Sequence, residues 1–272
     1  MKFGSSDIAS VKLGSSNVSA IYVGSTQIYP TFLPPDFVSL GIQLYYNPQD
    51  PDSYPGTGTT VNDLSGNGYN GTLINGPTFS TNSFTLDGVN DYIATPNMVS
   101  SFNSTSAFTI EVWYKPAYTG QNQGGTVLQE SGTSTPATTW YYNQFEFSTA
   151  PFGSLAYDYC SIWDGTVVPV NPPGTSNATA WRLITLTYDG VTGRSYRNGG
   201  PTFGSATLTR SLPWDNAAGY FYMIGAGSVT KQIANGINNF KGQIGIVRSY
   251  NRALDASEIL QNYNGAKSVY GL

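Results

Sequence analysis

Carboxylates are the side chains of this sequence that are ready for acid–base chemistry near neutral pH. The 272 residues include no histidine, which excludes histidine-based triads, histidine metal sites and histidine general bases. A retaining glycoside hydrolase needs two carboxylates that flank the scissile bond. The chain has four glutamates, and none has an acidic neighbour two or four residues away: Glu111, Glu130, Glu146 and Glu258. We therefore expect no catalytic residues and no enzymatic activity.

A segment rich in glycine and asparagine, from Val61 to Leu73, holds the next candidate group. The Asp63 carboxylate, the Asn67 side chain and exposed carbonyls could gather around calcium, which takes about six to eight oxygen ligands. The segment contributes a single carboxylate, and turn chemistry explains its composition equally well, because Gly66 and Gly68 supply positive-φ positions. Two interpretations stay open here: a calcium site formed by Asp63 and Asn67, or a purely structural loop.

Aromatic residues gather in residues 117–180, a long and irregular segment of the kind that forms binding surfaces on β scaffolds. Exposed aromatics of this segment and of residues 212–222 could stack on sugar rings. The candidates for glycan contact are Trp140, Trp163 and Trp214. Burial in a core is the alternative for each aromatic, and the alternation from Trp140 to Phe147 permits a strand.

The overall composition suits many strands joined by tight turns. Aromatic residues make up 14% and charged residues 10%, with 31 Gly and 16 Pro. A net charge of −4 without a basic cluster predicts no nucleic-acid partner, and no apolar run is long enough for membrane insertion. The N-terminus lacks the features of a secretory signal, and the one cysteine, Cys160, cannot form an internal disulfide. These features predict folding in a reducing compartment.

The fold is organised around Phe108–Pro116, in which Phe108, Ile110 and Val112 fall on one side of an extended chain. Four segments have the same character and are bounded by turn residues: Phe84–Ile93 with a turn at Asp87-Gly88, Trp181–Tyr188, Tyr220–Ile224 and Phe240–Tyr250. Asp255, followed three residues later by Glu258, marks the start of one short helix. The pattern predicts an all-β protein.

Residues 1–30 are a decapeptide repeat: MKFGSSDIAS, VKLGSSNVSA and IYVGSTQIYP. Each unit reads as a short strand, a Gly-Ser turn and a second short strand. Apolar residues recur at two positions of the unit: Phe3, Leu13 and Val23, then Ile8, Val18 and Ile28. Thirty residues bury little surface, so we interpret them as a docking segment for another subunit. A terminal β ribbon folded back on its own domain is the alternative.

Domain boundaries follow from the proline-rich linker at residues 31–36, which separates the repeat from a domain at residues 37–272. Four motifs of that domain, in order, resemble a laminin G-like domain of the concanavalin A-like lectin/glucanase superfamily across about residues 40–265: LDGVNDYI, FTIEVWYKP, ITLTYDG…YRNG and FKGQIGIVRSYNRALDASEI. The resemblance implies a jelly-roll sandwich of two antiparallel sheets, often used for glycan or protein binding and often carrying calcium. The repeat resembles N-terminal segments of tailed-bacteriophage virion proteins.

These resemblances predict a non-catalytic bacteriophage virion protein, either a head decoration or fibre protein or a tail-fibre component, assembled in the host cytoplasm. It would dock to other virion proteins through residues 1–30, form a homo-oligomer and present its lectin-like domain to a surface glycan. A glycan-binding adhesin outside a virus and a glycoside hydrolase of the same fold are the alternatives. Hydrolases of this superfamily carry a strand resembling E-x-D-x-E, which none of the glutamates matches.

Overall fold

The computed structural model describes nine stretches of the chain in detail: residues 37–98, 107–117, 125–131, 145–149, 158–163, 167–170, 179–208, 221–227 and 239–272. Six short strands between residues 2 and 29 are described by their backbone alone. Five residues within the nine stretches are also described without their side chains: Ser131, Thr149, Trp163, Val167 and Phe203.

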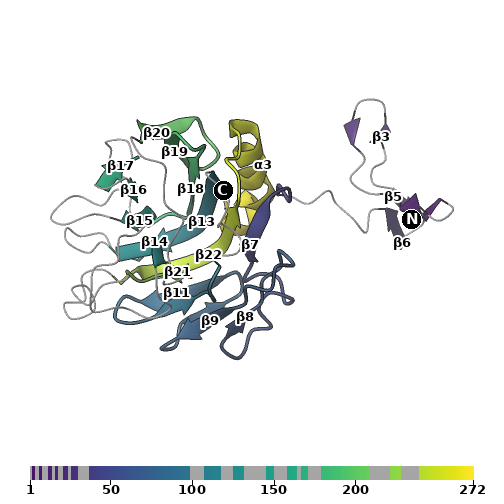
Figure 1. The fold of residues 1–272 in the computed structure, drawn as a ribbon. Coiled ribbons are helices and arrows are strands. Elements are labelled where there is room, and N and C mark those ends of the chain that lie inside the picture. Colours follow the sequence, from purple (N-terminus) through teal and green to yellow (C-terminus); the bar gives the residue numbers. More distant parts are fainter. Residues whose placement is uncertain are drawn as a thin grey trace.

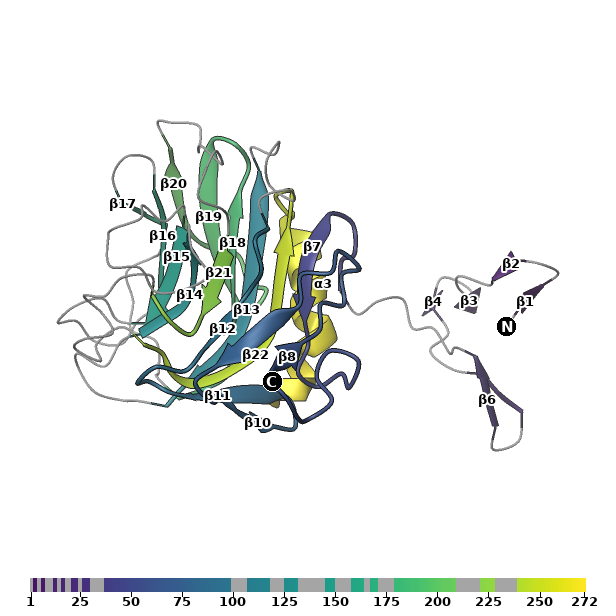
Figure 2. The ribbon, with the colours of Figure 1, turned by 60° about the horizontal axis from the view of Figure 1, so that its bottom comes forward.

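Two antiparallel sheets form the sandwich in Figures 1 and 2, and each has eight strands. Sheet I runs in the order β10 (Thr78–Ser80), β11 (Ser83–Asp87), β22 (Lys241–Tyr250), β13 (Phe108–Pro116), β18 (Arg182–Tyr188), β19 (Thr192–Arg197) and β20 (Thr202–Thr207), with β7 (Ile42–Tyr46) paired to β22. Sheet II runs in the order β17 (Val167–Pro169), β16 (Asp158–Trp163), β15 (Phe145–Thr149), β14 (Gly125–Ser131), β21 (Phe221–Ile224), β12 (Tyr92–Ala94), β9 (Gly71–Ile74) and β8 (Thr60–Val61). The predicted all-β jelly-roll sandwich is confirmed.

Strand β13 lies near the centre of sheet I, between β18 and β22, with the bounds that the alternation predicts. Phe108, Ile110 and Val112 point into the space between the sheets, where they are fully buried. Phe108 stacks on Phe145 of sheet II, with ring centroids 5.3 Å apart. The main hydrophobic core therefore lies between the sheets, where apolar faces of both meet.

Helix α3 (Ala256–Ala266) and the short helix η1 (Lys267–Tyr270) pack on the outer face of sheet I, as Figure 1 shows beside β13, β22 and β7. The Asp255 side chain accepts hydrogen bonds from the Ser257 and Glu258 amides, and Glu258 reaches back to the Asp255 amide. The predicted capping box is thus confirmed. Outward-facing Trp113 stacks on Tyr270 at 4.5 Å, which fixes the helical layer to the sheet. No helix in the described part of the chain has the length and apolar character to cross a bilayer.

The Asp87-Gly88 turn forms as predicted, with Gly88 at φ 79°, but the strands on its two sides do not pair with each other. Strand β11 pairs with β22 in sheet I, whereas β12 pairs with β9 and β21 in sheet II. The turn carries the chain from one sheet to the other. The turn residues specify where the chain changes direction. They do not specify the strands that pair with β11 and β12, which are set by burial of the apolar faces of the two sheets.

The segment from 117 to 180, interpreted as long and irregular, contains four strands of sheet II: β14, β15, β16 and β17. Phe145 and Phe147 of β15 are buried in the main core, which favours the core interpretation for these two aromatics. The strands are three to seven residues long, and the alternation of β14 is interrupted at the register shift between Thr126 and Leu128. Periodicity alone therefore did not distinguish these strands from a loop.

In the decapeptide repeat, each unit contributes one two-stranded antiparallel sheet of its own. The pairs are β1 (Lys2–Phe3) with β2 (Ser6–Asp7), β3 (Lys12–Leu13) with β4 (Ser16–Asn17), and β5 (Ile21–Val23) with β6 (Thr26–Tyr29). The sequence predicts this arrangement, with one short strand on each side of the Gly-Ser position. Ile8 and Val18 lie outside the described residues. The linker, the domain boundary and the docking role remain predictions.

Candidate functional site

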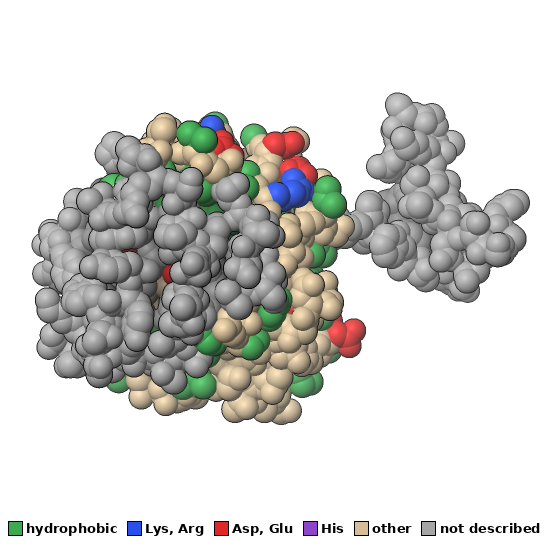
Figure 3. Space-filling model, viewed as in Figure 1, with side chains coloured by type: hydrophobic (Ala, Val, Ile, Leu, Met, Phe, Trp, Pro, Cys, Tyr) green, Lys and Arg blue, Asp and Glu red, His purple; other side chains and the backbone are tan. Residues whose placement is uncertain are grey.

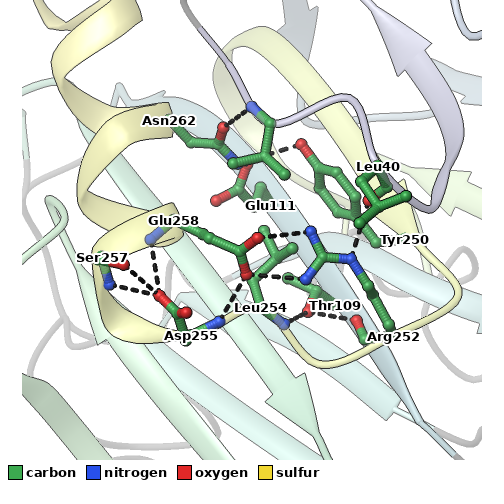
Figure 4. A network of polar contacts seen from close by, with 11 residues as sticks. Leu40, Thr109, Glu111, Tyr250, Arg252, Leu254, Asp255, Ser257, Glu258 and Asn262 are labelled. Atoms are coloured by element: carbon green, nitrogen blue, oxygen red, sulfur yellow. Dashed lines mark hydrogen bonds and ion pairs between the residues drawn. The ribbon is translucent and has the colours of Figure 1, made fainter.

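Glu111 lies on the outward side of β13, under helix α3, and is fully buried. Its carboxylate lies beside Asn262 (Figure 4), accepts hydrogen bonds from the Asn262 amide at 2.8 Å and from the Thr185 hydroxyl at 3.2 Å, and pairs with Arg248 at 3.4 Å. Burial raises the pKa of Glu111, while the Arg248 guanidinium opposes that rise. A carboxylate enclosed in this way holds the helix on the sheet and has no access to a substrate.

Asn262 extends this network to the first residues of the domain. Its side-chain oxygen accepts a hydrogen bond from the Val38 amide at 2.6 Å, and its nitrogen also donates to the Tyr250 hydroxyl at 3.1 Å. The ring of Phe37 lies 5.0 Å from the Arg248 guanidinium. The chain therefore joins the sandwich on the outer side of sheet I, beside α3.

Glu258 stabilises the start of α3. It binds Arg252 through both carboxylate oxygens, at 2.7 and 2.8 Å, besides completing the capping box (Figure 4). The hydrogen bonds from Arg252 lower the pKa of Glu258. This glutamate is thus a helix-positioning group.

Asp158 joins the two sheets from the inner face of β16. It pairs with Arg182 of β18 at 3.0 Å and with Arg197 of β19, and it accepts a hydrogen bond from the Tyr114 hydroxyl. Only 3% of the Asp158 side chain is exposed. Breaking a buried pair costs far more than its formation contributes, so loss of either arginine would destabilise the contact between the sheets.

Glu146 and Glu130 lie on neighbouring strands but on opposite faces of sheet II. Glu146 is paired with Gln129, and Gln129 shares the outer face with Met223. Glu130 is paired with Tyr222, which belongs to the core between the sheets. Side chains on one strand alternate between faces, so Glu130 and Glu146 cannot flank one bond.

Glu146, like Glu130, has no structural role that its neighbours along the chain predict. It is partly exposed on the outer face of sheet II, and it accepts a hydrogen bond from the Thr126 hydroxyl at 3.3 Å. Burial raises its pKa, and hydrogen bonds from Thr126 and Ser148 oppose the rise. Directly across from it stand Gln129 and Ser161, neither of which carries a charge. The alternation in FEFST, residues 145–149, was the available signal for its outward position.

The Asp63 loop is held together by hydrogen bonds that end on the carboxylate. The amides of Tyr45, Ser65 and Tyr69 donate to Asp63, at 2.9, 2.9 and 3.0 Å. Asn67 directs its amide nitrogen to backbone carbonyls of Ile42 and Gln43, and the described residues include no group of three or more His, Cys, Asp or Glu side chains that could hold a metal ion. Donors around the only carboxylate of the loop fit turn chemistry better than a cation. Calcium bound by Asp63 and Asn67 remains a prediction.

The tryptophans predicted to contact glycan are not placed by the structure. Trp140 and Trp214 lie outside the described residues, and Trp163 is described by its backbone alone, paired with Val167 at the end of β16. The roles of these three tryptophans in glycan contact therefore remain predictions. On the face in Figure 3, charged side chains of the described residues are few, and no basic patch is seen there.

Two solved structures show the same fold. Domain 4 of AbnA, a GH43 extracellular arabinanase from Geobacillus stearothermophilus in complex with arabinotriose, is similar with a TM-score of 0.57 and 16% identity; the match covers 82% of this chain and 98% of that domain. Trypanosoma rangeli sialidase in complex with 2,3-difluorosialic acid gives a TM-score of 0.60 and 16% identity, over 85% of this chain. The match covers only 34% of the sialidase, and at this identity both likenesses show the fold alone.

The sequence itself matches a family model. A search of curated proteins found no match. The laminin G-type model described as "Concanavalin A-like lectin/glucanases superfamily" matches residues 87–260, which is more than half of the chain and includes β13, β18, β22 and the beginning of α3. The protein therefore belongs to the concanavalin A-like lectin/glucanase superfamily.

Proposed function

We propose that the protein is a non-catalytic binding protein of a bacteriophage virion, a decoration or fibre component that docks through residues 1–30. Its lectin-like sandwich is displayed outward for contact with a surface glycan. The observation that carries the non-catalytic part is the arrangement of the glutamates. Glu146, on an outer face, stands opposite Gln129 and Ser161, and Glu130 belongs to the opposite face.

The remaining two glutamates support the same conclusion. Glu111 is sealed beneath α3 in contact with Arg248, and Glu258 is bound through both oxygens by Arg252. A retaining mechanism requires two carboxylates about 5–5.5 Å apart on either side of one bond. No two glutamates of this chain are arranged on one open face within the described residues.

Glycan binding is supported by the domain of the arabinanase. The present chain matches 98% of that domain, which was solved in complex with arabinotriose, so the likeness covers a whole module. Only 34% of the sialidase is matched. Sugar binding is the simplest function that this chain would share with such a module, although the fold alone does not specify it.

The display geometry is supported by where the chain joins the sandwich. Val38 is bound by Asn262 of α3, on the outer side of sheet I. Glu146 and its row of cross-strand neighbours lie on the outer side of sheet II. Because the attachment segment precedes Val38, sheet II lies on the side of the sandwich opposite the point of attachment. The virion location itself rests on the decapeptide repeat.

The experiment that tests this proposal combines a glycan array with assays for release of reducing sugar, using the purified full-length chain. We expect binding to at least one surface polysaccharide and no hydrolysis of any. Sugar release that is abolished by Glu146→Gln, and retained in the exposed control Asp189→Asn, would overturn the non-catalytic assignment. Glycan binding by a protein that is absent from purified particles would favour the alternative, an adhesin outside a virus.

A further inference from the structure

The register of the three hairpins in residues 1–30 places one apolar residue of each unit at the same paired position: Phe3, Leu13 and Val23. In the first unit Phe3 pairs with Ser6 and Lys2 pairs with Asp7. In the second unit Leu13 pairs with Ser16 and Lys12 pairs with Asn17. Residues that pair directly share a face, and neighbours along a strand lie on opposite faces. Each of these two units therefore has one face that includes an apolar residue and one that is polar.

The third unit matches the first two in one of its pairs, whereas its other face carries the aromatic residue Tyr22. Val23 pairs with Thr26, and Tyr22 pairs with Gln27. The register shifts between Ile21 and Tyr22, so Ile28 has no direct partner in β5 and alternation does not assign it to the face of Val23. The position of the apolar face within the unit is thus repeated three times, at intervals of ten residues.

No hairpin covers this face by itself. Each of the three makes a separate two-stranded sheet, joined neither to another hairpin nor to the described strands of the sandwich. Isolated two-stranded hairpins are at best marginally stable in water, and repeated units gain stability when neighbours cover their apolar faces. Burial of one Phe, Leu, Val or Ile side chain contributes only about 1.5–3 kcal/mol, so several units must be covered together.

We infer that the apolar faces of the three hairpins pack against the same faces of a second copy of this chain. The inference rests on the docking role proposed above and names the partner of the docking segment. A partner that covers all three units must present apolar surface at the same decapeptide interval, and a second copy does so by construction. Two lysines and one aspartate give residues 1–30 a net charge of +1 (2 − 1), so like charge does little to oppose their association.

The test is the molar mass of the full-length chain by light scattering coupled to gel filtration. We expect a whole-number multiple of 29.2 kDa, two or greater. Leu13→Ser with Val23→Ser changes the apolar face and should return the mass to 29.2 kDa. The matched control, Lys12→Ser with Tyr22→Ser, changes adjacent positions on the opposite face and should keep the oligomer. Urea unfolding of each variant should match the wild type and so exclude damage to the sandwich.

Two outcomes would overturn the inference. One is a wild-type chain of 29.2 kDa at every concentration at which it is soluble. The other is an equal response of the two variants, whether both dissociate or both remain oligomers. Incorporation into particles is measured separately. A monomeric chain that still enters particles through residues 1–30 would refute self-association and leave the proposed function standing. An oligomer that is absent from particles would support self-association and refute the proposed virion role.

Discussion

Removal of the Glu111 carboxylate should destabilise the sandwich more than loss of any exposed ion pair. In Glu111→Ala, the Arg248 side chain, 2% exposed, keeps its charge and loses its carboxylate partner, and Asn262 loses one acceptor. Breaking a buried pair in this way typically costs about 3–5 kcal/mol. Because 1 kcal/mol moves the melting temperature of a large domain by about 2–4 °C, we expect a fall of about 6–20 °C.

The assay is urea unfolding followed by tryptophan fluorescence, because buried Trp113 stacks on Tyr270 and reports the contact between helix and sheet. Asp189→Ala is the matched control, since it breaks an ion pair with Arg194 in which both side chains are 37% exposed. Exposed pairs contribute about 0–1 kcal/mol. A loss below 1 kcal/mol for Glu111→Ala, equal to that of the control, would refute the reasoning.

A double variant separates the cost of an unpaired charge from the value of the pair. Replacing both partners, as in Glu111→Leu with Arg248→Met, removes the buried charges together, and such replacements are often neutral or stabilising. We therefore expect the double variant to recover most of the stability that the single variant loses. A double variant as unstable as Glu111→Ala would show that hydrogen bonding by Asn262 and Thr185, rather than charge, accounts for the loss.

The pH dependence of stability has opposite signs at Glu111 and Glu258. Burial raises the pKa of Glu111, so the folded state holds its proton more tightly and this group favours folding increasingly as pH falls through the raised value. Arg252 lowers the pKa of Glu258, so its contribution is present above the unfolded value and is lost as pH falls through the lowered value. Unfolding curves of Glu111→Gln and Glu258→Gln across acidic pH should therefore deviate from the wild type in opposite directions.

Three further predictions concern the start of the domain, the glycine-rich loop and the tryptophans. Asn262→Ala should lower the free energy of unfolding by at least about 2 kcal/mol, because Val38 and Glu111 each lose a hydrogen bond, and urea unfolding measures this loss. If the Asp63 loop binds calcium, a chelator should lower the melting temperature of the wild type, whereas an unchanged curve with chelator and with Asp63→Ala would leave turn chemistry as the explanation. If the domain is an adhesin, alanine at one of three positions should weaken glycan or host binding without unfolding the domain: Trp140, Trp163 or Trp214.

Local patterns predicted the elements whose signals are complete within a few residues. The alternation of Phe108–Pro116 gave the bounds of β13, and Asp255 with Glu258 gave the start of α3, because strand alternation and helix capping are short-range effects. Sheet membership was not predictable in the same way. The strands on the two sides of Gly88 belong to different sheets because each pairs with a segment more than one hundred residues away, β22 or β21.

The glutamates show the same limit at the level of the candidate site. None of the described strands carries two carboxylates, and the glutamates have no acidic neighbour two or four residues away along the chain. That spacing could not show that Glu130 and Glu146 lie on neighbouring strands, because the pairing of Glu146 with Gln129, the residue before Glu130, is a tertiary property. The opposite faces of these two side chains follow from the register of β14 and β15, and only the folded sheet supplies that register.

The central claim is tested most directly by mass spectrometry of purified phage particles. Particles are made with the full-length chain or with a chain that lacks residues 1–30, and cooperative urea unfolding verifies that residues 37–272 still fold. The account predicts that the full-length protein is a stoichiometric component of the particle and that the folded, truncated chain is absent. Equal incorporation of the two chains, or absence of the full-length protein from particles, would contradict it.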